Sequence, residues 1–310
     1  MQAKGELSKL AVNRDTMLTV GVFDGVHLGH QHLLAELKNK AQSKNMASGV
    51  VTFKRHPLET LAPDRPVTYL SSLEERLSLI QAQGIDIIAP LTFDADLATL
   101  NARDFVLLLK EHLRMKDLFI GPNSTLGKGK EGNAARLTEL GKELGFTVDV
   151  AAPLQSGSIV VSSTAIRQAL ADGDMEAATR MLGRHFSLSG SVIHGDKRGR
   201  VIDYPTANVN VAADRALPPD GVYTTIAIVD DNKYDAVTNV GLRPTFAKQQ
   251  RTVEVFLLNF HQDLYGKDIT IELVEKIRPE MKFASAADLS HQIDRDVGHA
   301  KATLAKIGKH

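Results

Sequence analysis

The hydrophobic pattern in the first part of the chain alternates between two kinds of segment. Short apolar runs, typical of buried strands, take turns with longer stretches whose apolar residues recur at helical spacing. Strands that alternate with helices predict an α/β fold with a doubly wound parallel sheet, whose ligands bind at the carboxyl ends of the strands. The expected strands cover residues 19–23, 50–53, 85–91, 118–121 and 148–150. The expected helices include residues 31–38, 102–113, 134–144 and 163–170, with a short helical pair over 171–183.

The pattern changes after Arg184, where short alternating runs are separated by turn residues. Several short strands with turn signals predict a small antiparallel β-barrel. Residues 287–305 repeat apolar positions at helical spacing and predict a terminal amphipathic helix. The expected barrel strands cover residues 187–193, 222–229, 235–240, 253–258 and 269–273. We therefore predict two domains, residues 1–184 and 185–310, in a chain longer than most single domains.

The amino-acid composition excludes or disfavours several kinds of ligand and partner for this protein. Basic and acidic residues number 37 each, so the net charge is zero, and no block of like charge occurs. This balance argues against a nucleic acid held by bulk electrostatics. The chain has no cysteine, which excludes disulfides and thiolate metal sites. Its polar first residues and the lack of a long apolar run lead us to expect a cytoplasmic protein with no membrane partner. The oligomeric state is left open.

The turn after the first predicted strand carries two imidazoles, His27 and His30, on either side of Gly29. A helix N-terminus presents unpaired N–H groups and partial positive charge, so it favours an anion such as phosphate. Gly29 lets a phosphate approach the backbone without meeting a Cβ. The alternative is that the glycines only form a turn and the histidines lie on the surface. His56 and the loop after Gly121 also follow strands, so we expect them at the same edge of the sheet.

Three further stretches have both a structural and a functional interpretation. Ser162, Ser163 and Thr164 suit a helix start as caps, but with Arg167 one turn later they also suit a triphosphate. In the second domain the basic glycine loop 195–200 precedes Pro205-Thr206-Ala207-Asn208, and both could be ordinary hairpin connections. Glu254 is the one acid of an otherwise apolar strand, where an acid commonly faces solvent.

These motifs together resemble a known family. The HxGH pattern resembles the signature of nucleotidylyltransferases, which attack the α-phosphate of ATP and release pyrophosphate. The fuller string GVFDGVHLGHQ at residues 21–31 is similar to the opening motif of the bacterial bifunctional riboflavin kinases/FAD synthetases. The SSTxIR and PTAN motifs of that family match residues 162–167 and 205–208, and residues 239–245, 264–267 and 277–280 match its kinase half. The resemblance extends from about residue 19 to about residue 300.

For the first domain the resemblance implies an FMN adenylyltransferase, in which the FMN phosphate attacks the α-phosphorus of ATP. His27 and His30 are then catalytic, stabilising the charge that grows on the phosphate oxygens. The residues implied to bind ATP or its phosphates are Gly21, Phe23, Asp24, Gly29, His56, Ser162, Ser163, Thr164 and Arg167. The residues implied to bind the flavin are Asn123 and Asn133.

For the second domain the resemblance implies a riboflavin kinase that also uses ATP. Thr206 and Asn208 are then Mg²⁺ ligands, and Glu254 is the general base for the 5′-hydroxyl of riboflavin. Mg²⁺ prefers oxygen ligands and is usually held by few protein groups together with phosphates. The residues implied to bind ATP here are Gly195, Asp196, Lys197, Arg198, Gly199 and Asn239.

The first domain departs from the family pattern at two places. Lys54-Arg55 stands where the family usually has Asp-Pro, and residues 123–127 replace an aspartate and a Phe-Arg-Phe-Gly run. The added charges could strengthen phosphate binding or be solvated, and the lost aromatics would have packed on the isoalloxazine ring. Two alternatives follow, a riboflavin kinase with a weak or altered adenylyltransferase, and a non-catalytic regulator that senses flavins or nucleotides. An intact general base at Glu254 argues against the regulator.

Overall fold

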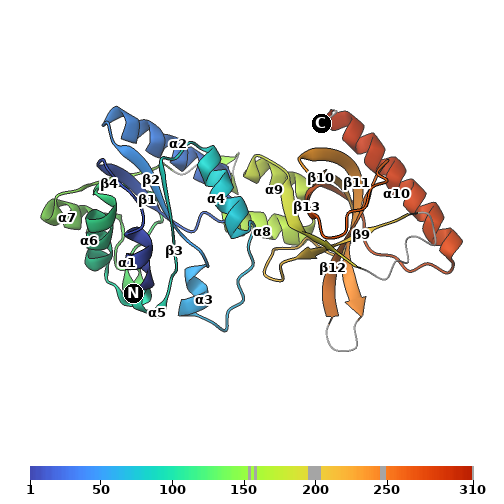
Figure 1. Cartoon of the computed structure of the whole chain (residues 1–310), viewed down its shortest axis with the longest axis horizontal. Coiled ribbons are helices and arrows are strands. Elements are labelled where there is room, and N and C mark those ends of the chain that lie inside the picture. Colours follow the sequence, from blue (N-terminus) through green and yellow to red (C-terminus); the bar gives the residue numbers. More distant parts are fainter. Residues whose placement is uncertain (153–154, 157–158, 195–203, 245–248, 309–310) are drawn as a thin grey trace. The chain divides into compact units, whose positions relative to one another are not determined.

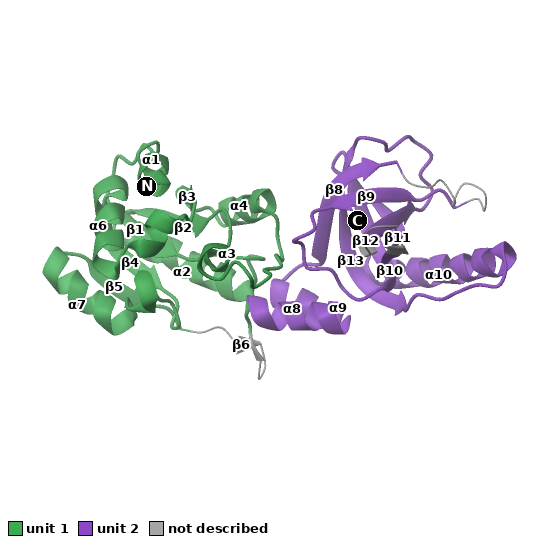
Figure 2. Ribbon diagram, turned by 90° about the horizontal axis from the view of Figure 1, so that it is seen from below, with its two compact units in different colours: residues 1–162 green, residues 163–310 purple. Residues whose placement is uncertain are grey.

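The computed structural model describes residues 1–152, 155–156, 159–194, 204–244 and 249–308 (Figure 1). The chain divides into two compact units, Met1–Ser162 and Ser163–His310, which are described separately here (Figure 2). The contacts place helices α8 (Ser163–Asp172) and α9 (Met175–Leu182) with the second unit. A domain boundary between residues 184 and 185 stays a prediction.

The first unit contains a five-stranded parallel sheet with strand order β3-β2-β1-β4-β5. Every residue of the central strands β1 and β2 is buried, as expected for a parallel sheet covered on both faces. Because β2, β1 and β4 are neighbours, the loops that follow them meet at one edge. The strands are β1 (Thr16–Val20), β2 (Ala47–Phe53), β3 (Ile87–Leu91), β4 (Met115–Ile120) and β5 (Thr147–Val150). The predicted doubly wound architecture is confirmed.

Helices cover both faces of this sheet through two separate hydrophobic clusters. One cluster joins α1, α5, α6 and α7 to the side chains of Leu18 and Val51, and the other joins α2 and α4 to those of Met17 and Val50. Adjacent strand residues thus serve opposite faces. The helices are α1 (Gln2–Leu7), α2 (Leu28–Ser43), α3 (Pro57–Leu61), α4 (Leu73–Ala82), α5 (Ala95–Thr99), α6 (Ala102–Leu113) and α7 (Ala134–Leu144), with a short 3₁₀ turn at Lys128–Lys130.

The second unit is built on a closed antiparallel barrel with strand order β10-β11-β12-β9-β8-β13. The predicted barrel and terminal helix are therefore confirmed. The helix α10 (Ala286–Ile307) covers the outer face of β10 and β11 through a small cluster of Val222, Val237 and Ala300. The strands are β8 (Phe186–Ile193), β9 (Ala207–Val211), β10 (Gly221–Val229), β11 (Asn232–Pro244), β12 (Gln249–Leu257) and β13 (Asp268–Arg278).

Two connecting regions differ from expectation. Residues 171–183 hold one helix, α9, rather than the expected pair. Gly173 has φ 76° and ends α8, and Asp174 then caps α9 by accepting the Ala177 N–H at 2.8 Å. The short strands β6 (Gln155–Ser156) and β7 (Ile159–Val160) pair with each other before α8. Across the described ranges, no helix combines the length and the apolar character that a membrane crossing requires.

Candidate active sites

The turn between β1 and α2 holds His27 and His30 face to face. The two rings stack with centroids 3.7 Å apart and planes 15° apart. His27 is buried and caps α2, since its Nδ1 accepts the backbone N–H of His30 at 3.3 Å. A neutral His27 must then carry its proton on Nε2, where it can donate to a ligand. Phe23 and Val26 in this turn have φ of 55° and 38°, a left-handed backbone that costs non-glycine residues strain and recurs at functional sites.

The imidazole of His30 is largely shielded from solvent, although part of the residue is exposed. Its Nδ1 is buried and has no hydrogen-bond partner among the described residues. The pKa of His30 lies well below its usual value of 6.5, mainly because the ring is buried and also because His27 is its neighbour. A neutral ring beside the start of α2 therefore offers an unpaired nitrogen, which a ligand such as a phosphate can satisfy.

The shifted pKa of His30 should make unfolding depend on pH. As the pH falls below about 6.5, an unfolded chain binds a proton at this residue before the folded chain does, so the free energy of unfolding decreases until the lower folded pKa is passed. The variant His30→Asn has no titrating group at this position, so its free energy of unfolding should not show this decrease. We expect the stability difference between wild type and variant, measured by urea unfolding from about pH 7 to about pH 5, to shift in favour of the variant. A difference that stays constant over this range would contradict a neutral, desolvated His30.

Asp24 ties the glycine turn to the segment that leads into α4. Its buried carboxylate accepts the backbone N–H groups of Leu70 at 3.0 Å and of Ser71 at 3.1 Å. In addition, the backbone N–H of Gly25 donates to the Ser71 hydroxyl at 3.0 Å. The structure thus places Asp24 where it holds backbone in position. Its expected part in phosphate binding stays a prediction.

His56 lies at the carboxyl end of β2, where the strand order brings it beside the glycine turn. Its Nδ1 caps α3 by accepting the Leu58 N–H at 3.1 Å, and its backbone N–H donates to the Tyr69 hydroxyl at 2.6 Å. Tyr69 in turn donates to Glu59 at 2.5 Å. Burial and this hydrogen bond raise the pKa of Tyr69 to about 12, so Tyr69 keeps its proton.

The two basic residues that depart from the family pattern are both paired within this chain. Arg55 donates from Nε to Glu59 at 2.8 Å, and Lys54 donates from Nζ to Glu6 at 2.8 Å. Glu6 also accepts the N–H and the hydroxyl of Thr92, each at 2.7 Å. Although burial raises the pKa of Glu6, the hydrogen bonds from Lys54 and Thr92 outweigh burial and lower it. Arg55 is exposed in spite of its ion pair, so it is at least partly solvated, and a phosphate contact of either residue stays a prediction.

The Lys54–Glu6 pair predicts that substitutions of Lys54 destabilise the protein. Lys54→Asp should reduce the free energy of unfolding by about 1–2 kcal/mol, because it places two carboxylates together and leaves Glu6 without its cation. Lys54→Met removes only the charge and should cost less. Urea unfolding of both variants tests this pairing. A loss in Lys54→Asp no larger than the loss in Lys54→Met would show that the charge pair is not the cause.

An apolar pocket of about 650 Å³ opens at the carboxyl ends of β1 and β2. Its wall includes Phe53, Phe93 and Phe105, and the rings of Phe53 and Phe93 meet edge to face at 5.3 Å. Three separate segments thus provide aromatic surface that the loop 123–127 lacks. The remaining lining residues are Val20, Gly21, Val22, Pro57, Leu61, Leu97, Ala98, Leu100, Ser124, Thr125, Leu126, Gly127, Lys128, Gly129 and Lys130.

The other predicted residues of the first site have varied positions. Asn123 is exposed on the loop after β4, whereas Asn133 caps α7 by accepting the Arg136 N–H at 3.0 Å. Gly29 has no room for a side chain without moving His27, since a Cβ there would lie 3.1 Å from His27 Cε1. Residues 163–167 begin α8, and the division between the compact units falls just before them. A phosphate site shared by the histidines and residues 162–167 therefore stays a prediction.

In the barrel, Glu254 lies in one row with two amides. It pairs with Asn208 of β9 on one side and with Asn239 of β11 on the other. Residues directly opposite in antiparallel strands point to the same face, so the three polar side chains are neighbours. Thr206, just before β9, donates its hydroxyl to the Glu254 carboxylate at 3.4 Å. The fold thus brings together four of the residues expected in the kinase site.

This polar row forms part of a pocket of about 640 Å³ on the outer face of the barrel. Thr206, Asn239 and Glu254 line it together with apolar side chains from the end of the chain. Asp296 of α10 and Arg278 of β13 form a buried ion pair, 2.8 Å from Nη2 to Oδ2, which fixes the helix against the barrel beside the pocket. The other lining residues are Tyr204, Val222, Val237, Phe256, Glu280, Met281, Phe283, Leu289 and Ile293.

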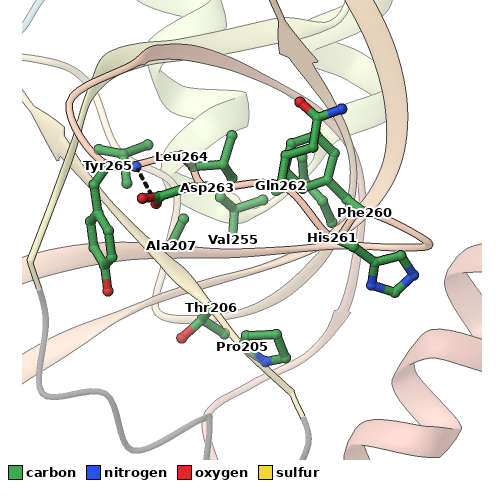
Figure 3. A pocket seen from close by; sticks show the side chains of 12 residues that line it. Pro205, Thr206, Ala207, Val255, Phe260, His261, Gln262, Asp263, Leu264 and Tyr265 are labelled. Carbon is green, nitrogen blue, oxygen red and sulfur yellow. Dashed lines mark hydrogen bonds between the residues drawn. The ribbon is translucent and has the colours of Figure 1, made fainter.

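The barrel has a second pocket, of about 480 Å³ (Figure 3). Thr206 lines both this pocket and the first barrel pocket, which contains Glu254. Pro205, Thr206 and Ala207 form one side, and the loop 260–265 forms the other. On β12, Val255 and Leu257 line this second pocket, whereas Glu254 and Phe256 line the first. Because successive strand residues point to opposite faces, the two pockets lie on either side of β12.

Sequence reasoning singled out residues 264–267 by their resemblance to the kinase half but missed residues 260–263, which belong to no motif that it used. In the loop 260–265, Tyr265 donates its N–H to Asp263 at 3.1 Å (Figure 3). The ring of Tyr265 packs on His194 with centroids 4.1 Å apart. The predicted ATP ligands Gly195, Asp196, Lys197, Arg198 and Gly199 lie outside the described residues.

Oxygen donors suited to Mg²⁺ lie in and beside the row of Glu254 and the two amides. Thr206 offers a hydroxyl, Asn208 an amide oxygen and Glu254 a carboxylate, and hard cations prefer such ligands. Among the residues that the structure covers, no group of three or more His, Cys, Asp or Glu side chains could hold a metal ion. Mg²⁺ is usually bound jointly by few protein oxygens and by phosphates, and the hydroxyl, amide and carboxylate oxygens here are of the type that it prefers.

A parallel sheet with paired imidazoles at its carboxyl edge, followed by a barrel that carries a carboxylate between two amides, is an arrangement suited to a two-part enzyme of phosphate chemistry. Residues 9–165 match the family described as FAD synthetase, and residues 182–304 match the family described as riboflavin kinase. The chain belongs to the family of bifunctional riboflavin kinase/FMN adenylyltransferases. The resemblance noted in the sequence is thereby confirmed.

Relatives of that description match along almost the whole chain. The bifunctional riboflavin kinase/FMN adenylyltransferase of Escherichia coli is 40% identical over 282 residues, covering 90% of each chain. That of Bacillus subtilis is 35% identical over 299 residues, covering 95% of this chain and 94% of the other. A crystal structure titled as a macrolide-efflux protein from Streptococcus pneumoniae has a TM-score of 0.88 at 30% identity, covering 95% of this chain and 96% of that one.

Proposed function

We propose that this chain makes FMN from riboflavin and then FAD from FMN, using ATP in both steps. The observation that carries the proposal is the row of Asn208, Glu254 and Asn239, in which the Glu254 carboxylate lies 3.4 Å from the hydroxyl of Thr206, the residue that both barrel pockets share. A carboxylate that lines one pocket and accepts a hydrogen bond from Thr206, which also lines the other pocket, suits a proton transfer between two substrates. The order of the two family matches along the chain, FAD synthetase before riboflavin kinase, supports the assignment of one step to each unit.

In the kinase step, riboflavin occupies the larger, mostly apolar pocket, and ATP occupies the pocket beside Thr206. Glu254 accepts the proton of the 5′-hydroxyl while that oxygen attacks the γ-phosphorus and ADP leaves. Asn239 lies next to Glu254 in the row and can orient the hydroxyl or a phosphate oxygen. Gly195 to Gly199 are proposed to bind the ATP phosphates, as expected from the sequence.

Thr206 and Asn208 are the residues proposed to hold Mg²⁺ in this step. The ion supplies charge neutralisation on the phosphate oxygens when bound. The Thr206 hydroxyl, which donates to Glu254 in this structure, would then turn its oxygen toward the ion. Glu254 would be left with an open lone pair for the substrate proton.

In the adenylyl step, the FMN phosphate attacks the α-phosphorus of ATP and pyrophosphate leaves. Neutral His27 donates from Nε2, and neutral His30 lies beside it under the N-terminus of α2, so both face the oxygens that gain charge. His56 is proposed to contact phosphate through Nε2, since its Nδ1 is used in capping α3. For Asp24, which accepts backbone N–H groups, we propose a positioning role beside the predicted part in phosphate binding.

The apolar pocket with Phe53, Phe93 and Phe105 is proposed to take the isoalloxazine ring of FMN. A flat aromatic ring gains from edge or face contacts with such side chains. This pocket therefore supports an active adenylyltransferase in spite of the altered loop 123–127. Asn123 remains a proposed flavin ligand from the loop, and Asn133 is proposed to act by starting α7. Since both steps consume ATP, the proposed compartment is the cytoplasm.

The test is to incubate the purified chain with riboflavin, ATP and Mg²⁺ and to separate FMN from FAD by chromatography. Both products, with FMN appearing first, are expected. FMN alone would show that the adenylyltransferase unit is inactive, and neither product would overturn the proposed function. A second incubation that supplies FMN directly separates a failed first step from a failed second one.

A further inference from the structure

Arg76 is a buried arginine at the catalytic edge of the first unit, and none of the sequence motifs includes it. It lies in the second turn of α4 and is only 1% exposed. A charged side chain is rarely buried so completely unless it is paired. The side chains of α4 that face the sheet are otherwise apolar, as Ile80 is.

The guanidinium of Arg76 binds three backbone carbonyls from two different strand ends. Nη1 donates to the Val22 carbonyl at 3.0 Å, and Nη2 donates to those of Phe53 at 2.7 Å and Lys54 at 3.2 Å. Val22 begins the turn that leads to His27 and His30, whereas Lys54 begins the turn that leads to His56. One planar group thus links the two histidine-bearing turns at their roots.

Other contacts around Arg76 serve the same turns. Thr52 donates its hydroxyl to the Val22 carbonyl at 3.0 Å, adding a second donor to the acceptor that Arg76 uses. Burial lowers the pKa of Arg76, and the negative charge of Asp24 raises it. An arginine keeps its proton under such conditions, so the buried cation balances the buried carboxylate of Asp24.

We propose that Arg76 is a positioning residue for adenylyl transfer, which sets the spacing between the His27–His30 turn and the His56 turn. This inference rests on the proposed function of the first unit. Lysine cannot replace arginine here, because its single ammonium cannot reproduce a planar fork that spans two strand ends. A small displacement of positioned groups lowers turnover steeply while substrate binding changes less.

The experiment compares Arg76→Lys with Arg103→Lys in the full-length chain. Arg103 lies in the same unit, forms an exposed ion pair with Glu143, and contacts none of the proposed site residues in any interaction described here. FAD formation from FMN and ATP should lose roughly ten- to hundredfold in kcat in Arg76→Lys, with KM for ATP changed less than about threefold. FMN formation from riboflavin in the same protein should stay at the wild-type rate, as should both steps in Arg103→Lys.

A purely structural role is distinguished by chemical rescue. In Arg76→Ala, millimolar guanidinium should restore part of the FAD-forming kcat, whereas the same concentration of methylammonium should not. If Arg76→Lys and Arg76→Ala both fail to fold, Thr52→Val replaces them, with an expected loss of about threefold in kcat at unchanged KM. FAD formation within twofold of wild type in the folded variant would overturn the inference. Absence of FAD formation in the wild type would instead overturn the proposed function.

Discussion

Replacing Glu254 by glutamine should reduce riboflavin phosphorylation by about 10²- to 10⁴-fold, the usual contribution of a positioned general base. Glutamine keeps the size of the side chain and can still accept the Thr206 hydroxyl, so the junction of the two pockets should keep its shape. It cannot take the proton of the 5′-hydroxyl. The loss should therefore appear in kcat, with KM for ATP changed little.

The measurement is the rate of FMN formation from riboflavin and ATP, followed by chromatography. Glu272→Gln is the matched control, since Glu272 also projects from a barrel strand but pairs with Lys233, away from the proposed site. FAD formation from supplied FMN should be unaffected in both variants, because that step belongs to the other unit. Near-normal FMN formation in Glu254→Gln would exclude Glu254 as the base.

The positions of the site residues in the sheet followed from the order of elements. His27, His56 and Gly121 lie on the segments that follow β1, β2 and β4, and parallel strands end at the same edge. In the barrel, the alternation on β12 marked Glu254 as facing away from the apolar interior. Its neighbours could not be read in this way, because the pairing of Glu254 with Asn208 joins residues far apart in the sequence.

The ion-pair partners of Lys54 and Arg55 could not be predicted from the sequence, for a different reason. Glu6 and Glu59 lie on α1 and α3, helices of six and five residues that are too short to produce a periodic pattern. Arg76 gave no sign either, since an arginine among leucines and glutamates of an amphipathic helix is usually solvated. Only the packing of α4 against the sheet shows that its guanidinium is buried.

The aromatic surface of the first unit illustrates the same limit. The lack of aromatic residues at 123–127 suggested a weakened flavin site, because this short stretch alone was compared with the Phe-Arg-Phe-Gly run of the family. The structure assembles the pocket instead from Phe53 at the end of β2, Phe93 after β3 and Phe105 on α6. A pocket made from three segments depends on the fold as a whole and leaves no local signature.

Replacing His30 by alanine should lower FAD formation from FMN and ATP by about a hundredfold or more. His30 lies beside His27 with its ring stacked at 3.7 Å, and its Nδ1 has no partner among the described residues, so a phosphate oxygen or the ligand's hydroxyl can be its partner in the working enzyme. If the imidazole acts mainly in the transition state, kcat should fall more than the affinity for ATP. His27→Ala should show a similar loss of rate together with about 1 kcal/mol of lost stability, because His27 also caps α2.

The assay supplies FMN, so that the kinase step is bypassed, and it reads FAD and pyrophosphate together. His32→Ala is the control on the same helix, since His32 is exposed and pairs with Glu36. Riboflavin phosphorylation should remain at the wild-type rate in all three variants, because the residues of the proposed kinase site belong to the second unit. His30→Asn, which keeps a hydrogen-bonding group in a smaller side chain, should lose less than His30→Ala. Unchanged FAD formation in His30→Ala would mean that this turn shapes the fold without taking part in the chemistry.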